Sequence, residues 1–171
     1  FIFFMILFYS STIFAKDIPI IVISPGKTLQ SKSVVGSDVE VIDKKTLQDS
    51  NEYFIGDILD NNLNGMNYFQ QGGIGTVSGM QLRGQPKRYT TVYIDGVKVS
   101  DPSTPSNDYY FNNLISGSFE RIEVLKGAQS SLYGSGALAG TIQLFSKKGR
   151  EGHNNDINLS TGSFNTKKID L

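Results

Sequence analysis

The chain has 171 residues, of which 39% are hydrophobic and 19% charged, with 18 glycines and a formal net charge of zero. This composition suits one folded domain rich in turns and argues against disorder of the whole chain. Because 16 basic residues balance 16 acidic ones, no general field attracts nucleic acid. The absence of cysteine excludes disulfides, thiolate metal sites and cysteine nucleophiles.

The first fifteen residues, FIFFMILFYSSTIFA, indicate export. They are uncharged, apolar through Phe8, and small and polar before Ala15, as the apolar core and cleavage region of a secretory signal are. A helix needs about 20 residues to span a bilayer, so the stretch is too short to do so. The alternative is a buried N-terminal strand or helix. Because no initiator Met and no basic region precede the stretch, we expect residues 1–15 to be a partial signal peptide.

The next segment, KDIPIIVISPGKT, predicts an edge strand. Its β-branched residues favour a strand, Pro19 removes one backbone donor, and Pro25-Gly26 ends the run. An edge strand near the mature N-terminus can pair with another protein by adding to that protein's sheet. The alternative is a strand of the domain's own sheet.

A compact α/β pattern follows. Residues 39–42 predict a short strand, and Asp43 can cap a turn that begins at Lys44. Ser50 is expected to cap a helix that Gly65 stops. The apolar positions that recur at helical spacing in this helix are Ile55, Ile58, Leu59 and Leu63.

Strands and loops alternate after Gly65. Residues 66–70 are expected to be extended, 70–79 to form a glycine-rich loop, and 80–83 to return as strand. Residues 89–99, YTTVYIDGVKV, predict a hairpin because Asp-Gly accommodates the left-handed angles of a two-residue turn. Residues 100–113 read as an exposed loop with polar and aromatic groups, either an ordinary surface loop or a ligand contact.

The glycine-rich stretch ERIEVLKGAQSSLYGSGALAGTIQLFSKKG covers residues 120–149 and predicts two strands, 122–125 and 141–146. Its glycines invite comparison with a dinucleotide fingerprint, but the spacing Gly134-x-Gly136-x-x-x-Gly140 is wrong for that motif. We therefore expect a turn and close backbone packing instead of a nucleotide site. The charged residues Glu120, Arg121 and Glu123 are interpreted as a polar sheet face with local ion pairing.

Three motifs, MQLRG (80–84), VYIDGVKV (92–99) and the stretch 120–149, occur in an order that resembles the plug domain of TonB-dependent outer-membrane transporters, with a layout most similar to the cobalamin-transporter branch. The resemblance implies an α+β fold: a small mixed-sheet plug domain with short helices over 31–149, followed by the start of a truncated transmembrane β-barrel over 150–171. Residues 16–30 would then be the TonB-box segment and linker.

The resemblance also implies partners and sites. Periplasmic TonB would pair by strand addition with seven residues: Asp17, Ile18, Pro19, Ile20, Ile21, Val22 and Ile23. Substrate would bind at loops that face the cell exterior, and the candidates are Gly73, Asp101, Asn107, Asp108, Tyr109 and Tyr110. Arg83 and Lys126 match cations that face acidic groups on the family's barrel wall. The alternative for Lys126 is a simply solvated side chain.

The function expected from the resemblance is uptake of a scarce nutrient, such as cobalamin or a ferric siderophore, energised through TonB. The protein would lie in the Gram-negative outer membrane, with the plug facing the periplasm and the barrel lumen. We expect no cofactor and no enzymatic activity, since the sole histidine, His153, suggests neither a metal cluster nor a catalytic triad. A weak hypothesis places calcium near Asp101 and Asp108. The alternative function is a secreted or surface ligand-binding module with the plug fold that does not transport.

Residues 156–171, DINLSTGSFNTKKIDL, predict two strands around a polar turn and resemble the first barrel hairpin. A barrel of about 22 strands with about 10 residues each needs on the order of 220 residues. The stretch after Gly149 is far shorter, so we expect the chain to be a fragment of a transporter.

Overall fold

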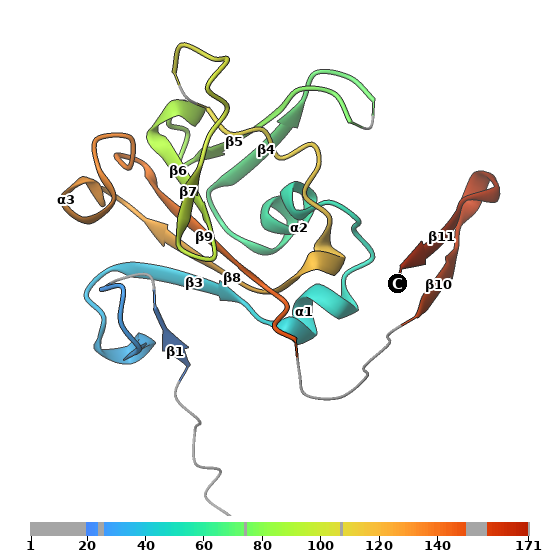
Figure 1. Cartoon of the computed structure of the whole chain (residues 1–171), viewed down its shortest axis with the longest axis horizontal. Helices are drawn as coiled ribbons and strands as arrows, with labels where there is room; N and C mark the ends of the chain where they lie inside the picture. The colour runs from blue at the N-terminus through green and yellow to red at the C-terminus, as the bar shows by residue number, and fades with distance from the viewer. Residues whose placement is uncertain (1–19, 24–25, 74, 107, 150–156, 171) are drawn as a thin grey trace, which may run out of the picture.

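The computed structural model describes residues 20–23, 26–73, 75–106, 108–149 and 157–170. Its centre is a five-stranded sheet in the order β3-β8-β9-β6-β7 (Figure 1). These strands are β3 (Asp38–Ile42), β8 (Phe119–Lys126), β9 (Gly140–Ser146), β6 (Thr90–Ile94) and β7 (Val97–Val99). Because β6 and β9 run parallel while the other neighbours run antiparallel, the sheet is mixed, as predicted.

One face of the sheet carries the main hydrophobic core. Ile122 and Val124 of β8 point to this face, together with Ile142 and Leu144 of β9, because side chains alternate along a strand. They pack against three elements that cover the face: α2 (Ile55–Asn62), β4 (Met66–Gln70) and β5 (Ser78–Leu82). The last two form an antiparallel pair of their own.

The opposite face carries a second, smaller core. Leu125 of β8 and Val39 of β3 lie there as cross-strand neighbours. Above them pack Val22 and Tyr133, which come from β1 (Ile21–Val22) and α3 (Ser130–Tyr133), and Ala137. The N-terminal segment therefore covers part of the sheet, with β1 paired to β2 (Gln30–Ser31).

The predicted hairpin is confirmed. Asp95 and Gly96 have φ angles of 49° and 83°, the left-handed pair that a type I′ turn needs between β6 and β7. The Asp95 carboxylate also accepts hydrogen bonds from the backbone N–H and the hydroxyl of Ser146, at 2.9 and 2.6 Å. The turn is thus tied to the end of β9.

The prediction that glycines between β8 and β9 serve packing is confirmed at Gly140. A Cβ built there would lie 2.2 Å from the backbone oxygen of Leu125 and 2.3 Å from the Leu82 side chain. Gly134 ends α3 with a φ of 86°, where it allows the turn toward β9.

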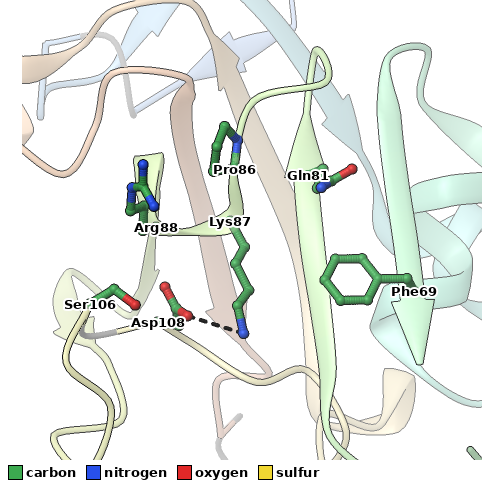
Figure 2. Close-up of a pocket in the computed structure, with 7 residues that line it drawn as sticks. All are labelled: Phe69, Gln81, Pro86, Lys87, Arg88, Ser106 and Asp108. Carbon is green, nitrogen blue, oxygen red and sulfur yellow. Dashed lines mark ion pairs between the residues drawn. The ribbon is translucent and has the colours of Figure 1, made fainter. Parts of the chain in front are cut away.

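The expectation of an exposed loop over 100–113 is partly wrong. The Asp108 side chain is only 5% exposed and Phe111 only 1%. Asp108 pairs with Lys87 at 3.0 Å (Figure 2), and Phe111 belongs to the main core. The C-terminal part of the 100–113 segment is therefore held against the domain by an ion pair and a core contact, which its polar composition does not predict.

Three predicted boundaries also differ from the structure. Ser50 ends α1 (Lys44–Asp49), whereas α2 begins at Ile55, whose N–H donates to the Leu114 carbonyl at 2.9 Å. Gly65 lies three residues beyond α2, in the turn to β4 with a φ of 74°. Arg83 follows β5 in a turn with a φ of 53°. Short 3₁₀ turns complete the secondary structure: η3 (Lys32–Val34), η4 (Lys87–Tyr89), η5 (Ser116–Ser118) and η6 (Ser163–Asn165).

The hairpin predicted near the C-terminus is confirmed as β10 (Asn158–Thr161) and β11 (Lys167–Asp170), an antiparallel pair. Leu159 and Ile169 are exposed on it, as is Ile157 just before it. Its place at the start of a barrel stays a prediction. Among the helices in the described part of the chain, none has both the length and the apolar character needed to cross a bilayer.

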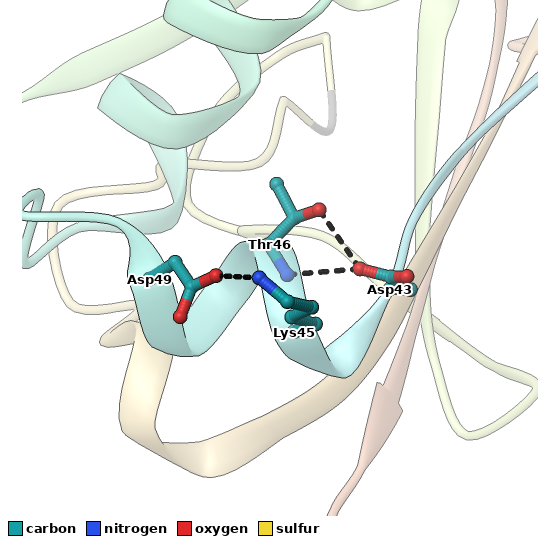
Figure 3. Close-up of polar contacts among 4 residues, drawn as sticks. All are labelled: Asp43, Lys45, Thr46 and Asp49. Carbon is teal, nitrogen blue, oxygen red and sulfur yellow. Dashed lines mark hydrogen bonds and ion pairs between the residues drawn. The ribbon is translucent and has the colours of Figure 1, made fainter.

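Asp43 caps α1, as the sequence predicts for the turn at Lys44. Its carboxylate accepts hydrogen bonds from the backbone N–H and the hydroxyl of Thr46, both at 2.8 Å (Figure 3). These bonds hold the pKa of Asp43 below its ordinary value of 3.8. Lys45 and Asp49 form an exposed ion pair on the same helix.

Replacing Asp43 with Ala should lower the free energy of unfolding by about 0.5–2 kcal/mol, because an N-cap acceptor is lost. Since the folded pKa is depressed, this stabilisation is complete above the unfolded value and disappears as pH falls through the folded value. Urea unfolding of the wild type and of Asp43→Ala, at pH 7 and in acid, measures the difference in their free energies of unfolding. As a control, Asp49→Ala removes an exposed ion pair that solvent screens, and its effect should be much smaller than that of Asp43→Ala. Equal losses for the two variants would contradict the capping role.

Candidate functional site

The N-terminal segment is the first candidate site. Of the seven predicted TonB-binding residues, Asp17, Ile18 and Pro19 lie outside the described residues. Ile20 is 53% exposed, whereas Val22 is fully buried in the second core. Residues 21 and 22 pair with 31 and 30 of the same chain, in a ladder only two residues long on each strand. In this structure the segment is thus docked against its own domain by a short ladder.

A buried carboxylate adds to this docking. The backbone N–H of Ile23 donates to both carboxylate oxygens of Glu123, at 3.0 and 3.2 Å. Glu123 is 0% exposed and pairs with Arg121 at 2.6 Å. Local ion pairing on β8 is therefore confirmed, but the expected polar sheet face is wrong at Glu123, which is buried on the face that carries the second core. The hydrogen bonds between Glu123 and the N-terminal segment were not predicted. The available signal was an acid inside the apolar run Ile122–Leu125, on the face of the sheet that the segment covers.

The predicted substrate residues form the second candidate site, and the structure brings only some of them together. A depression of about 260 Å³ lies between the β4–β5 pair and the segment after β7 (Figure 2). Asp108 lines it, while Gly73 and Asp101 do not, and Asn107 lies outside the described residues. The lining residues are Phe69, Gln81, Pro86, Lys87, Arg88, Ser106 and Asp108.

Tyr109 and Tyr110, which follow Asp108, make different contacts. The Lys87 ammonium group lies over the ring of Tyr110, 4.6 Å from its centre, so Tyr110 contacts a lining residue without lining the depression itself. Tyr109 packs edge-on against Phe111 at 5.3 Å, and burial raises the pKa of its hydroxyl. Tyr109 thus serves mainly to hold the segment against the core.

Asp101 stabilises the loop itself. Its carboxylate accepts a hydrogen bond from the Ser103 N–H at 2.9 Å, and the pKa of Asp101 is lowered by its hydrogen bonds with Ser103. Its own N–H donates to the Asp108 carbonyl at 2.8 Å. Among the described residues, no group of three or more His, Cys, Asp or Glu side chains could hold a metal ion. His153 lies outside those residues.

Sequence reasoning missed the two cations of the depression, Lys87 and Arg88. They occupy η4, between β5 and β6, and the proline that precedes them marks the turn. A basic pair at that turn, across from an acidic loop, was the signal that could have located them. Lys87 links the loop to the sheet through Asp108, and Arg88 stays exposed above the depression.

Arg83 and Lys126, the predicted barrel contacts, lie near each other beside β3. Arg83 pairs with Asp38 at 2.7 Å, and both side chains are about half exposed. Lys126 pairs with Glu40 at 2.7 Å and donates to the Asn64 carbonyl at 2.5 Å. Its side chain is only 4% exposed, so Lys126 is not simply solvated. Both cations thus have counterions within the domain, and contact with a barrel wall stays a prediction.

Comparison with known proteins identifies a matching family and related transporters. The family model described as TonB-dependent Receptor Plug Domain matches residues 31–141, which is more than half of the chain. The vitamin B12 transporter BtuB of Vibrio cholerae serotype O1 is 25% identical over 151 residues, covering 88% of this chain and 24% of the relative. BtuB of Vibrio vulnificus strain YJ016 is 29% identical over 143 residues, covering 84% and 23%. The chain thus spans about a quarter of the length of these relatives.

Solved structures agree on the fold. The ferripyoverdine receptor of the Pseudomonas aeruginosa outer membrane, bound to ferripyoverdine, superposes with a TM-score of 0.72 at 20% identity, covering 88% of this chain and 19% of that one. The alcaligin outer-membrane receptor FauA of Bordetella pertussis gives a TM-score of 0.65 at 16% identity, covering 85% and 24%. The names of these relatives describe transporters and receptors, not enzymes.

Proposed function

The chain belongs to the family of TonB-dependent receptor plug domains, and from this premise we propose that it gates an outer-membrane transporter that takes up a scarce nutrient with energy supplied through TonB. The observation that carries the proposal is the family match over residues 31–141, with curated relatives named as vitamin B12 transporters. Cobalamin and ferric siderophores are the candidate substrates. The proposed work is binding and gated passage, without covalent chemistry.

In this proposal the domain sits inside a β-barrel whose first strands follow Gly149. The lumen of such a barrel is polar, which suits a plug with a polar, glycine-rich surface. The hairpin β10–β11 supports the assignment, because the exposed residues Leu159 and Ile169 are cross-strand partners and so share one face. Arg83 is half exposed and can exchange Asp38 for an acid on the barrel wall. Lys126 would act from a more buried position.

TonB is proposed to capture residues 17–23 by strand addition. The docking of this segment supports the idea, because β1 pairs over only two residues and the Ile23 N–H is held by a side chain instead of a neighbouring strand. A strand with an incomplete ladder can exchange its own partner for a longer one. Pulling on it would act directly on β8 through Glu123.

Substrate is proposed to bind on the side of the loops 70–79 and 100–111, where the depression lies. The test is uptake of labelled vitamin B12 and of ferric siderophores by cells that express the receptor carrying this plug. Deletion of residues 17–23 should abolish uptake, because the segment proposed to pair with TonB is lost. The deletion also removes Val22 from the second core and the Ile23 donor from Glu123, so substrate binding retained at the cell surface is the control that the plug still folds. Uptake that continues at the wild-type rate would contradict active transport through this segment. Ligand binding by residues 16–171 alone, at the affinity of the receptor, would favour the secreted binding module instead.

A further inference from the structure

We propose that the hydroxyl of Thr104 is a positioning group for substrate. It holds the segment between Asp101 and Asp108 in one conformation and so raises the affinity of the receptor for the substrate that it transports. Thr104 itself does not line the depression, so it acts through residues that do. This inference rests on the proposed function and names a residue that sets the strength of binding at the proposed substrate site.

The Thr104 hydroxyl bridges the two ends of this segment. It donates a hydrogen bond to the Asp101 carbonyl at 3.0 Å and accepts one from the backbone N–H of Asp108, also at 3.0 Å. A threonine hydroxyl has a single proton to donate, so the bridge uses its donor and one of its acceptor sites at the same time. The Thr104 side chain is partly buried in this arrangement, although its neighbours Ser103 and Pro105 are exposed.

Backbone contacts fix the geometry of the bridge. The N–H of Asp101 donates to the Asp108 carbonyl at 2.8 Å, which closes the segment at its base. The N–H of Ser103 donates to the Asp101 carboxylate at 2.9 Å, and that of Thr104 donates to the Asp101 carbonyl at 3.3 Å. Asp101 and Asp108 are therefore joined twice, directly and through Thr104.

One end of the bridge is anchored in the domain. The Asp108 side chain is 5% exposed and pairs with Lys87 at 3.0 Å, and Phe111 shortly after it belongs to the main core. Figure 2 shows Ser106 and Asp108 together at one side of the depression, which both of them line. Because Ser106 stands between Thr104 and Asp108 in the chain, the bridge restrains it at the rim.

This restraint favours binding. A segment that is already ordered binds more tightly than one that its ligand must order, because the ordering costs free energy at the moment of association. Without the Thr104 hydroxyl, Ser106 would gain freedom, while the ion pair of Asp108 with Lys87 and the hydrogen bond at the base would remain. Loss of the hydroxyl should therefore weaken substrate binding without unfolding the plug.

Calorimetry on the purified receptor that carries this plug tests the proposal, since it gives both the dissociation constant and the number of functional sites. The probes are vitamin B12, a ferric trihydroxamate and a ferric tris-catecholate, and the variants are compared on whichever probe the wild type binds. Thr104→Val keeps the shape of the side chain but removes the hydroxyl, and it should raise the dissociation constant about 10-fold with an unchanged number of sites. Thr104→Ser keeps the hydroxyl and should restore wild-type affinity.

A merely structural role for Thr104 predicts a different result: fewer functional sites and an unchanged dissociation constant. Thr46→Val is the matched control, because Thr46 is also partly buried and its hydroxyl is hydrogen-bonded to Asp43, but it lies on α1 and does not line the depression. Its affinity for the probe should equal that of the wild type. Amide hydrogen exchange of the free receptor checks the bridge itself, since the peptide that contains Asp108 should exchange faster in Thr104→Val but not in Thr104→Ser.

A wild-type dissociation constant in Thr104→Val, or a weakened affinity that serine does not restore, overturns the inference. Uptake that depends on residues 17–23 would still stand in either case, so the proposed function survives this failure. A wild-type receptor that binds none of the three probes contradicts the proposed function and, with it, the role of Thr104.

Discussion

Replacing Gly140 with Ala is expected to destabilise the domain by about 3 kcal/mol or more, a large part of the stability of an ordinary domain. The added Cβ would lie 2.2 Å from the backbone oxygen of Leu125, which is far inside van der Waals contact. Gly140 also pairs with Lys126 in the sheet, so relief of the clash would separate β8 from β9. The Leu82 side chain, at 2.3 Å, blocks movement toward the main core.

Urea unfolding of the 171-residue chain measures this loss of stability, and alanine variants of two other glycines serve as comparisons. Gly134 has a φ of 86° with open space around it, so Gly134→Ala should cost only about 1 kcal/mol, from backbone strain. Gly149 has neither a positive φ nor a neighbour within 4 Å, and Gly149→Ala should be nearly neutral. A Gly140 variant as stable as the Gly149 variant would show that β8 and β9 do not approach as described.

Replacing Glu123 with Ala is expected to cost about 2–4 kcal/mol and to free the N-terminal segment. The lower end is the cost of leaving a buried hydrogen-bond donor without an acceptor, and the upper end is the cost of breaking a buried ion pair. The change removes the acceptor of the Ile23 N–H and the carboxylate partner of Arg121. Glu123→Gln keeps the shape and one acceptor oxygen, so it should cost less, about 1–2 kcal/mol.

Amide hydrogen exchange at Ile23 separates release of the segment from general destabilisation. Exchange at this amide should accelerate more than at amides of the central strand β9, because only the segment loses its anchor. Glu120→Ala is the control on the same strand: among the described residues its partly exposed side chain has no hydrogen bond or ion pair with the segment, and its effect should stay within about 0.5 kcal/mol. Equal protection of Ile23 in Glu123→Ala and in the wild type would rule out the anchor.

Elements specified by neighbouring residues could be predicted from the sequence. The hairpin between β6 and β7 follows from Asp95-Gly96, because few other dipeptides tolerate two left-handed residues in succession. The cap at Asp43 follows from one side chain three residues before its partner. In both cases the interaction that decides the structure is local.

Features set by distant contacts could not be predicted. The start of α2 depends on the carbonyl of Leu114, far along the chain, and Ser50 therefore could not reveal it. The burial of Asp108 depends on Lys87, and the role of Glu123 depends on the backbone of Ile23, 100 residues away. Polar composition predicts exposure on average, but a charge that meets a counterion in the fold is buried with it.

Cross-linking of residues 17–23 to TonB tests the central claim most directly. The chain contains no cysteine, so a single cysteine introduced at each of the seven positions gives an unambiguous site within it. With the receptor carrying this plug, a substrate it transports and a TonB that bears its own cysteine, we predict disulfide adducts at several positions, strongest in an alternating pattern typical of strand pairing. The absence of adducts at all seven positions, under conditions in which uptake proceeds, would contradict the account.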